Sequence, residues 1–473
     1  MPTNRESRIA VLDIPLRLDG PGSQSSRVHA GLRAAILDGR LAAGLRLPSS
    51  RALADQLGVR RNAVVVAYEL LLSDGLGEAR IGDGTYVAAQ VPRGPAAPDR
   101  VPAPAPPSGR GPFAVGCTTA DPILLRRLGR ALRDRVVRAD PGDLGYGDPR
   151  GHEALRRAIA AHLAATRGFA CDPSRIVITS GTQQGLRLCA EVLLHPGDAV
   201  WMEDPGYPTA RRTLEALRAR LVPVPVDAGG IDVAAGRARE ASARMAYVTP
   251  SHQFPTGVTM TMARRLALLD WAQATGAWIM EDDYDSEFRF AGAPLTALAG
   301  IDGQGRVIYL GTFSKTLFPG LRIGFVVVPA VLMGRVVAAR AVSDRFPSPL
   351  MGGALAEVME GGEFAAHLRR MRTLYRAARD MVAGTLAQAS GGRLGIALPD
   401  HGLHLLATLP DGLPAGTARQ IQAEAGVEGW LLSETRLVPA GCDGFVIGYS
   451  GHDSAALKAA AQRLGAAVRR ALG

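Results

Sequence analysis

The sequence contains very little lysine. Of its 54 basic residues 52 are arginine, and only Lys315 and Lys458 are lysine. Either residue type can serve as a solvated positive charge, but only lysine offers an amine that can lose its proton and attack a carbonyl carbon. Lys458 belongs to an amphipathic helical pattern near the C-terminus and is interpreted as a surface charge. Lys315 is the candidate nucleophile, and its context is described below.

Other absences exclude whole classes of protein. The four cysteines are scattered without a CxxC pair, which argues against a disulfide scaffold or a zinc module and favours a reducing compartment. The polar first ten residues lack the apolar stretch of a signal peptide, and no apolar run reaches the ~18 residues of a membrane span. We therefore expect a cytoplasmic protein without a membrane partner. The net charge of +10 suggests an anionic partner.

A composition break divides the chain. Residues 91–112 are rich in Pro, Ala and Gly and have no hydrophobic period, so they are predicted to form an extended linker. The linker separates a small domain, residues 15–90, from a large domain, residues 113–473. Nine arginines lie between Arg93 and Arg138; we interpret them as solvated, with contact to DNA phosphates as the alternative.

The large domain alternates short apolar runs with helical periods, as in the helix expected over 262–274. This alternation predicts an α/β fold with a largely parallel sheet, in which sites lie at the carboxyl ends of the strands. The expected buried strands are residues 175–179, 199–202, 245–249, 278–280, 307–310 and 324–328.

The small domain has the pattern of a helix-turn-helix. A helix is expected over 29–39, a second over 49–57 with Ser49 as N-cap, and a third over 60–74 after a turn at Gly58. The N-terminal end of the third helix would enter the major groove of DNA, where its guanidinium and amide groups can read bases or hold phosphates. Residues 81–87 are predicted to form a glycine-bent hairpin beside it.

The run LPSSRALADQLGVRRNAVVVAYELL, followed by GDGTYV, resembles the winged-helix domain of GntR transcription regulators over its whole length. The resemblance implies contacts with double-stranded operator DNA from the following residues: Ser49, Arg51, Arg60, Arg61, Asn62 and Gly82. The family usually has Ser or Thr at the position of Arg60 and often Arg at that of Val65, so no operator sequence can be carried over.

Lys315 lies in GTFSKTLFPGLRIGF, directly after a predicted strand, and the acidic cluster EDDYDSEF lies 33 residues upstream at another strand end. An aldehyde cofactor held as a Schiff base needs a lysine, and its pyridine nitrogen needs a buried carboxylate. Its phosphate needs hydroxyls, an arginine and backbone N–H groups, which SGTQQG at a helix start can supply. In this order and at strand ends, these elements resemble the fold-type-I, pyridoxal-phosphate-dependent aminotransferases of class I and II.

With the GntR-like segment in front, the whole chain is similar to the MocR-type regulators. This resemblance implies that Lys315 binds pyridoxal 5'-phosphate as a Schiff base, that Asp282 pairs with the ring nitrogen, and that Tyr284 hydrogen-bonds the ring 3-oxygen. Tyr207 would stack on the ring, and Tyr146 would reach the phosphate of a partner subunit in a domain-swapped homodimer. The implied phosphate ligands are Gly181, Thr182, Gln183, Thr312, Ser314 and Arg322.

Two departures bear on catalysis. Phe254 stands where most aminotransferases have an asparagine that assists the ring oxygen, as it does in MocR members. Val446 stands where catalytic aminotransferases have the arginine that clamps the substrate carboxylate, and Arg211, Arg372 or Arg436 would have to replace it. Without a bidentate clamp, efficient transamination is in doubt.

The leading hypothesis is a transcription regulator whose large domain senses pyridoxal phosphate, an amino-acid-like effector, or both, and alters DNA binding by the small domain. The alternative is an active aminotransferase that transfers an amino group from an amino acid to 2-oxoglutarate. A third possibility is a regulator whose large domain binds no cofactor, against which the retention of Lys315 argues.

Overall fold

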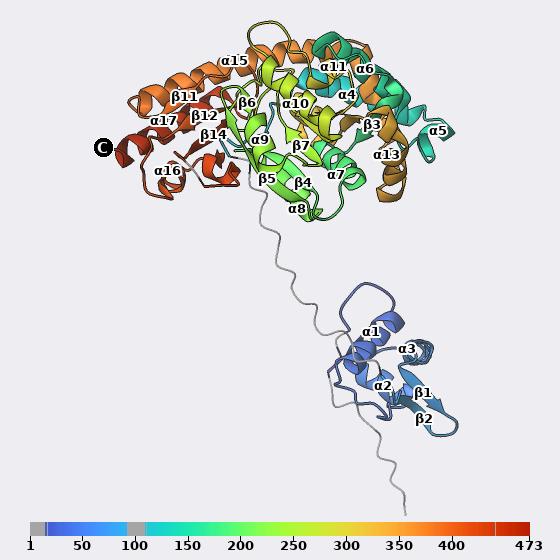
Figure 1. Cartoon of the computed structure of the whole chain (residues 1–473). Coiled ribbons are helices and arrows are strands. Elements are labelled where there is room, and N and C mark those ends of the chain that lie inside the picture. Colours follow the sequence, from blue (N-terminus) through green and yellow to red (C-terminus); the bar gives the residue numbers. More distant parts are fainter. Residues whose placement is uncertain (1–14, 17, 92–108, 110, 440) are drawn as a thin grey trace, which may run out of the picture. The chain divides into compact units, whose positions relative to one another are not determined.

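A computed structural model describes residues 15–16, 18–91, 109, 111–439 and 441–473 of the chain. The chain divides into two compact units between Ala105 and Pro106, and each is described by itself (Figure 1). Of the predicted linker over 91–112, only residues 91, 109, 111 and 112 belong to the described part.

The N-terminal unit consists of three helices followed by a hairpin. Its elements are α1 (Gln24–Leu37), α2 (Ser50–Leu57), α3 (Arg61–Ser73), β1 (Gly77–Arg80) and β2 (Gly84–Val87). Helix α1 begins earlier than predicted because the side chain of Ser23 accepts a hydrogen bond from the N–H of Ser26 and caps it. Ser49 caps α2 as predicted, by accepting a bond from the N–H of Ala52. The hairpin also begins earlier than predicted, so residues 81–83 form its tip.

The C-terminal unit is built on an eight-stranded sheet with the order β3-β10-β9-β8-β7-β4-β5-β6. Its strands are β3 (Ile176–Thr179), β4 (Ala199–Asp204), β5 (Arg220–Asp227), β6 (Gly230–Ile231), β7 (Met245–Val248), β8 (Trp278–Asp283), β9 (Val307–Thr312) and β10 (Gly324–Val327). All six predicted strands are present. The sheet is mixed: the five strands from β9 to β5 are parallel, whereas β10 runs antiparallel to both of its neighbours and β6 runs antiparallel to β5.

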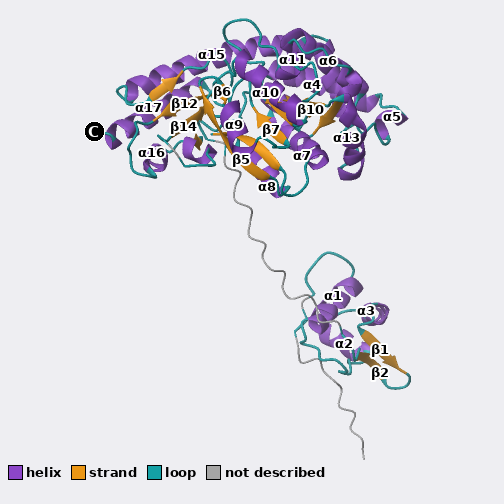
Figure 2. Ribbon diagram, viewed as in Figure 1, coloured by secondary structure: helices purple, strands orange, loops and turns teal. Residues whose placement is uncertain are grey.

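Both faces of this sheet are covered by helices (Figure 2). In β4, Val200 and Met202 pack with residues of α7 (Thr182–Leu193), α8 (Pro208–Ala216) and α13 (Ala330–Ser343). Trp201 packs on the other face with residues of α9 (Val233–Glu240) and α10 (Met262–Thr275). This two-residue alternation follows from the pleat of a strand, and burial on both faces explains the nearly continuous apolar sequence of the strands.

The helices of the unit are α4 (Pro122–Val137), α5 (Pro141–Leu144), α6 (Glu153–Arg167), α7 (Thr182–Leu193), α8 (Pro208–Ala216), α9 (Val233–Glu240), α10 (Met262–Thr275), α11 (Leu298–Ile301), α12 (Phe313–Thr316), α13 (Ala330–Ser343), α14 (Pro349–Glu360), α15 (Glu363–Ala389), α16 (Thr417–Ala425) and α17 (Ser454–Ala471). Short 3-10 turns lie at Pro173–Arg175, Pro319–Leu321 and Leu432–Thr435. Helices α15 and α17 lie side by side (Figure 1) and share a core with a second, antiparallel sheet of order β11-β12-β14-β13. Its strands are β11 (Gly395–Ala397), β12 (His404–Thr408), β13 (Trp430–Leu431) and β14 (Gly444–Gly448).

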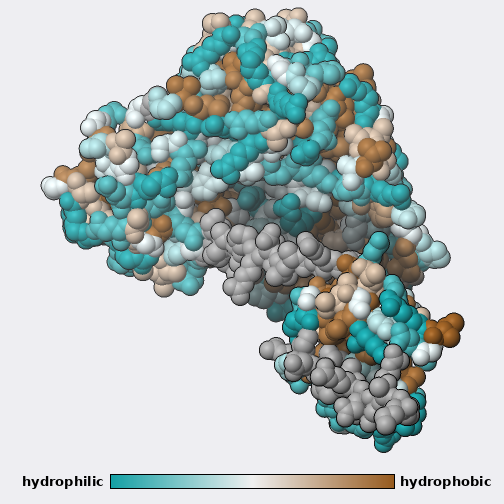
Figure 3. Space-filling view, turned by 90° about the horizontal axis from the view of Figure 1, so that it is seen from below, coloured by the Kyte–Doolittle hydropathy of each residue, from teal (hydrophilic) through white to brown (hydrophobic). Residues whose placement is uncertain are grey.

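On the face drawn in Figure 3, the hydrophobic residues of the described part of the chain lie in small groups among hydrophilic ones. Among the described residues, no helix is both long and apolar enough to span a bilayer.

Candidate functional site

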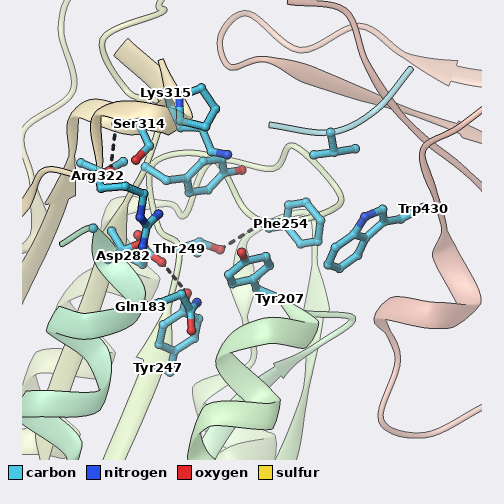
Figure 4. A pocket seen from close by; sticks show the side chains of 16 residues that line it. Gln183, Tyr207, Tyr247, Thr249, Phe254, Asp282, Ser314, Lys315, Arg322 and Trp430 are labelled. Carbon is cyan, nitrogen blue, oxygen red and sulfur yellow. Dashed lines mark hydrogen bonds between the residues drawn. The ribbon is translucent and has the colours of Figure 1, made fainter. Parts of the chain in front are cut away.

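A cavity lies at the carboxyl ends of the parallel strands, where sites are expected in such sheets. Strand β10 runs the other way, so the residues just before its start reach the same edge. Ten of the eleven predicted cofactor residues line this cavity; Tyr146 is the exception. The lining residues are Val115, Gly181, Thr182, Gln183, Tyr207, Tyr247, Thr249, Phe254, Asp282, Tyr284, Thr312, Ser314, Lys315, Pro319, Arg322 and Trp430 (Figure 4).

Asp282 comes from the end of β8 and is 5% exposed. Its Oδ2 accepts a hydrogen bond of 2.6 Å from the hydroxyl of Tyr247, while its buried Oδ1 has no hydrogen-bond partner. Burial raises the pKa of the Asp282 carboxyl to about 7. A buried acceptor without a partner costs free energy, so a protonated ring nitrogen placed at Oδ1 would be strongly favoured. Asp282 therefore fits the pyridine nitrogen of the implied cofactor.

Lys315 lies in the single turn of α12, immediately after β9. Its Nζ donates a hydrogen bond of 3.2 Å to the carbonyl oxygen of Gly116, and burial lowers the pKa of the amine. A lowered pKa increases the share of neutral amine, which is the nucleophilic form. Gly116 has φ +89°, and a Cβ atom at this position would lie 2.2 Å from Nζ of Lys315. Sequence reasoning missed this role of Gly116, because the two residues are 199 positions apart.

An anion cradle is formed where β3 leads into α7 and where the chain approaches β10. Gly181 is the N-cap of α7, and a helix start leaves its first N–H groups without intrahelical partners. The guanidinium of Arg322 lies beside Gly181 and donates a hydrogen bond of 2.6 Å to the carbonyl oxygen of Ser180. The buried Oγ of Ser314 has no partner. Free N–H groups, a guanidinium and a free hydroxyl are the donors that a phosphate needs.

Tyr284 is supported from behind by a buried histidine–aspartate pair. Its hydroxyl donates a hydrogen bond of 3.0 Å to the carbonyl oxygen of His252, whose Nδ1 lies 2.9 Å from Oδ2 of Asp285. Burial lowers the pKa of His252 to about 3 and raises that of Asp285 to about 7. The predicted partner of Tyr284 was the ring 3-oxygen; the pair that positions this tyrosine was not predicted.

The opposite wall of the cavity is aromatic. The ring of Tyr207 lies edge-on to Phe254 at 5.4 Å and nearly parallel to Trp430 at 6.1 Å, both measured between ring centroids. Phe254 and Trp430 meet edge-on at 5.7 Å. Figure 4 shows this aromatic wall on the side away from Lys315 and Arg322. No sequence signal indicated Trp430, which comes from the two-residue strand β13.

Tyr146 lies outside the lining of the cavity and is 83% exposed. Its ring lies edge-on to Phe346, with centroids 5.9 Å apart, and the guanidinium carbon of Arg345 lies 5.0 Å from its centroid. An exposed tyrosine of this kind is free to contact another molecule.

Val446, at the position of the carboxylate clamp, is fully buried in β14 and pairs in register with Leu406 and Trp430. The three arginines considered as replacements do not line the cavity. Arg211 forms an ion pair with Glu215 at 2.9 Å and donates to the carbonyl oxygen of Arg436. Arg372 donates a hydrogen bond of 2.6 Å to the carbonyl oxygen of Glu287.

The predicted DNA-binding residues all lie on the surface of the N-terminal unit. Arg60 is the N-cap of α3, and Arg61 and Asn62 follow in its exposed first turn. The Nε of Arg61 donates a hydrogen bond of 3.4 Å to the hydroxyl of Ser50 in α2. Three further predicted contacts, Ser49, Arg51 and Gly82, are also exposed, with Gly82 at the hairpin tip. Gly58 ends α2 with φ +63°, and this left-handed turn sets the angle between α2 and α3.

The chain matches two family models. Residues 24–87 match the bacterial regulatory proteins of the gntR family, and residues 118–464 match aminotransferase class I and II. It is 38% identical over 446 residues to the probable rhizopine catabolism regulatory protein MocR of Rhizobium meliloti, covering 90% of each chain. It is 37% identical over 402 residues to the HTH-type transcriptional regulator TauR of Rhodobacter capsulatus, covering 77% of this chain and 79% of TauR.

Among solved structures, the C-terminal unit is similar to kynurenine aminotransferase of Pyrococcus horikoshii, which was solved in complex with PMP. The TM-score is 0.70 at 26% identity, covering 77% of this chain and 92% of the enzyme. A GntR segment and an aminotransferase segment thus occur together in this one chain. The chain therefore belongs to the MocR-type family of transcription regulators, which join a GntR DNA-binding domain to an aminotransferase class I and II domain.

Proposed function

We propose that this regulator binds pyridoxal 5'-phosphate at Lys315 and uses the occupied cavity to sense an amine-bearing effector, which changes the affinity of the winged helix for operator DNA. The observation that carries the proposal is the pairing, across one cavity, of an amine with lowered pKa and a buried carboxylate oxygen without a partner. When bound, the cofactor supplies an aldehyde that condenses reversibly with amines.

The chain's own residues would divide the work of holding this cofactor. Asp282 would keep the ring nitrogen protonated, Tyr284 would bond the ring 3-oxygen, and Tyr207 would stack on the ring. The phosphate would bind the start of α7, Thr312, Ser314 and Arg322. Because Arg322 and Ser314 Oγ lie on the same side of the cavity as Lys315, one small molecule can reach all of these groups (Figure 4).

For the DNA-binding half, we propose that Arg60, Arg61 and Asn62 enter the major groove while Ser49, Arg51 and Gly82 contact the flanking backbone. We further propose domain boundaries at 15–90 and 113–473, joined by a linker over 91–112, in a cytoplasmic protein. Effector binding can shift DNA affinity only if the effector binds two arrangements of the protein unequally.

We also propose a domain-swapped homodimer in which Tyr146 contacts the partner's phosphate. The exposure of Tyr146 in the single chain supports this arrangement, since a large aromatic side chain gains free energy when a second subunit covers it. The dimer would place two winged helices on two half-sites, which matches the symmetry of many operators.

The test combines cofactor trapping with DNA footprinting. Borohydride reduction of the cofactor-loaded protein, followed by peptide mapping, is expected to label Lys315 and not Lys458, the exposed and only other lysine. Footprints on the divergent upstream region, with and without pyridoxal phosphate, are expected to differ for the unchanged protein and to be the same for K315A. K458A serves as the matched control and is expected to keep the difference.

Two outcomes would contradict the proposal. Label on another residue, or no label, would remove the cofactor assignment. Multiple-turnover transfer of amino groups to 2-oxoglutarate, together with no specific footprint, would favour an active aminotransferase instead.

A further inference from the structure

The cavity has few charged side chains, and each of them matches one polar group of the proposed cofactor. Asp282, Lys315 and Arg322 are the only charged side chains among the described residues that line it. The proposed cofactor presents three polar ends that match them: a ring nitrogen for Asp282, an aldehyde for Lys315 and a phosphate for Arg322. With the cofactor bound, the described lining that this chain itself contributes has no cationic side chain left for a second anionic group.

The remaining wall is aromatic. Phe254 and Trp430 form it next to Tyr207, and Val115 and Pro319 are also in the lining. Aromatic faces of this kind bury apolar or aromatic groups favourably. A carboxylate placed against them would lose its water without gaining a counter-charge, which is a large cost.

The strand that carries Trp430 offers no cation either. In the neighbouring strand β14 the residue opposite Trp430 is Val446, which is fully buried. Arg211 and Arg372 are engaged with Glu215 and with the carbonyl oxygen of Glu287. Arg436 lines a different cavity. The absence of a clamp is therefore built into the packing around Trp430 within the described part of the chain.

We propose that the effector is a primary amine without a carboxylate beside its nitrogen, whose uncharged, apolar body packs against Phe254 and Trp430. This inference rests on the proposed function, since it requires the cofactor at Lys315. The ligand's nitrogen would replace the lysine nitrogen at the cofactor's former aldehyde carbon: one C=N bond would form as the other breaks, and the protons of the ligand's amine would pass to Lys315, which would leave as a free amine. The exchange needs no oxidant or reductant.

The experiment uses a matched pair of probes, 2-phenylethylamine and L-phenylalanine, which differ only in the carboxylate. Both are titrated by calorimetry into the full-length, cofactor-loaded protein, after borohydride labelling of a parallel sample has established cofactor on Lys315. The amine is expected to bind at least about tenfold more tightly than the amino acid, a difference of roughly 1.4 kcal/mol. Equal affinities, tighter binding of phenylalanine, or no binding of either probe would overturn the inference.

Variants of Trp430 test the wall itself. W430A is expected to weaken binding of 2-phenylethylamine by about tenfold or more, and W430F to restore most of it, because a phenyl face remains. Unchanged affinity in W430A would refute the role of the wall. If the unchanged protein shows no label on Lys315, the proposed function fails; if Lys315 is labelled but the amino acid is preferred, only the effector class is wrong.

Discussion

Replacing Asp282 by asparagine is expected to have opposite effects on the cofactor-free and the cofactor-bound protein. Burial raises the pKa of this carboxyl from 3.8 to about 7. Between these values the folded state keeps a proton that the unfolded chain has lost, so stability falls as the pH rises from 3.8 to about 7 and levels off above that. A difference of about three pKa units corresponds to roughly 4 kcal/mol above pH 7. Asparagine removes this charge and can still accept the hydrogen bond of Tyr247.

In the cofactor-free protein, D282N should therefore be more stable than the unchanged protein at pH 8, and nearly equal to it at pH 5. The new amide N–H₂ has no acceptor, which offsets part of the roughly 4 kcal/mol that removing the charge contributes. We therefore expect the free energy of unfolding at pH 8 to rise by about 2–4 kcal/mol. Unfolding entropy of about 2.1 cal/mol/K per residue, over the 368 residues from Pro106 to Gly473, converts this gain into roughly 3–5 °C in Tm.

The same variant should bind pyridoxal phosphate less well. A charge-assisted hydrogen bond to a buried group contributes about 1.5–3 kcal/mol, so we expect an affinity loss of roughly 10- to 150-fold. Thermal unfolding at pH 5 and pH 8, with and without cofactor, measures both effects. D411N, at an exposed aspartate, is the control and should change neither. A lower Tm for cofactor-free D282N at pH 8 would show that the ionised carboxylate carries no burial cost, and the reasoning would fail.

Three further outcomes are expected. G116A should weaken cofactor binding by about tenfold or more, because alanine is strained at φ +89° and its methyl group would displace Nζ of Lys315, which would otherwise lie 2.2 Å away. Equilibrium titration with pyridoxal phosphate measures the loss, and unchanged affinity would contradict the contact. R61A should weaken operator binding by about 1–3 kcal/mol and, if Arg61 holds a phosphate, reduce the slope of log affinity against log salt concentration by about one. Gel-shift titrations at several salt concentrations measure both quantities, and R212A in the other unit is the control that should change neither. Mixing K315A with Y146A should restore cofactor binding at one of the two sites of a swapped dimer, because the Y146A subunit keeps Lys315 and receives Tyr146 from the other subunit. Absence of cofactor binding at both sites in the mixture would refute the swap.

Much of the fold could be predicted because the core strands are continuous apolar runs. Residues buried on both faces of a sheet must be apolar at every position, and this pattern is local. Strand β5 was not predicted because Pro223 and Pro225 interrupt its sequence, although its residues 220–225 pair with the whole of β4. In the second sheet, β11 and β13 escaped prediction because they are only three and two residues long, too short for a period to be counted.

The residues of the candidate site also fall into those that a local sequence motif predicts and those that only contacts in the folded chain identify. Ten predicted residues line the cavity because each stands in a motif directly beside a strand end, and parallel strands bring such ends to one edge. Gly116, Tyr247 and Trp430 carry no motif; they acquire their roles by contact with segments far away in the sequence. Gly116 is needed for the space it leaves around Nζ of Lys315, and Trp430 for the face it presents beside Phe254. Motifs therefore suffice to place the cofactor chemistry, whereas ligand choice depends on a wall that only the folded chain assembles.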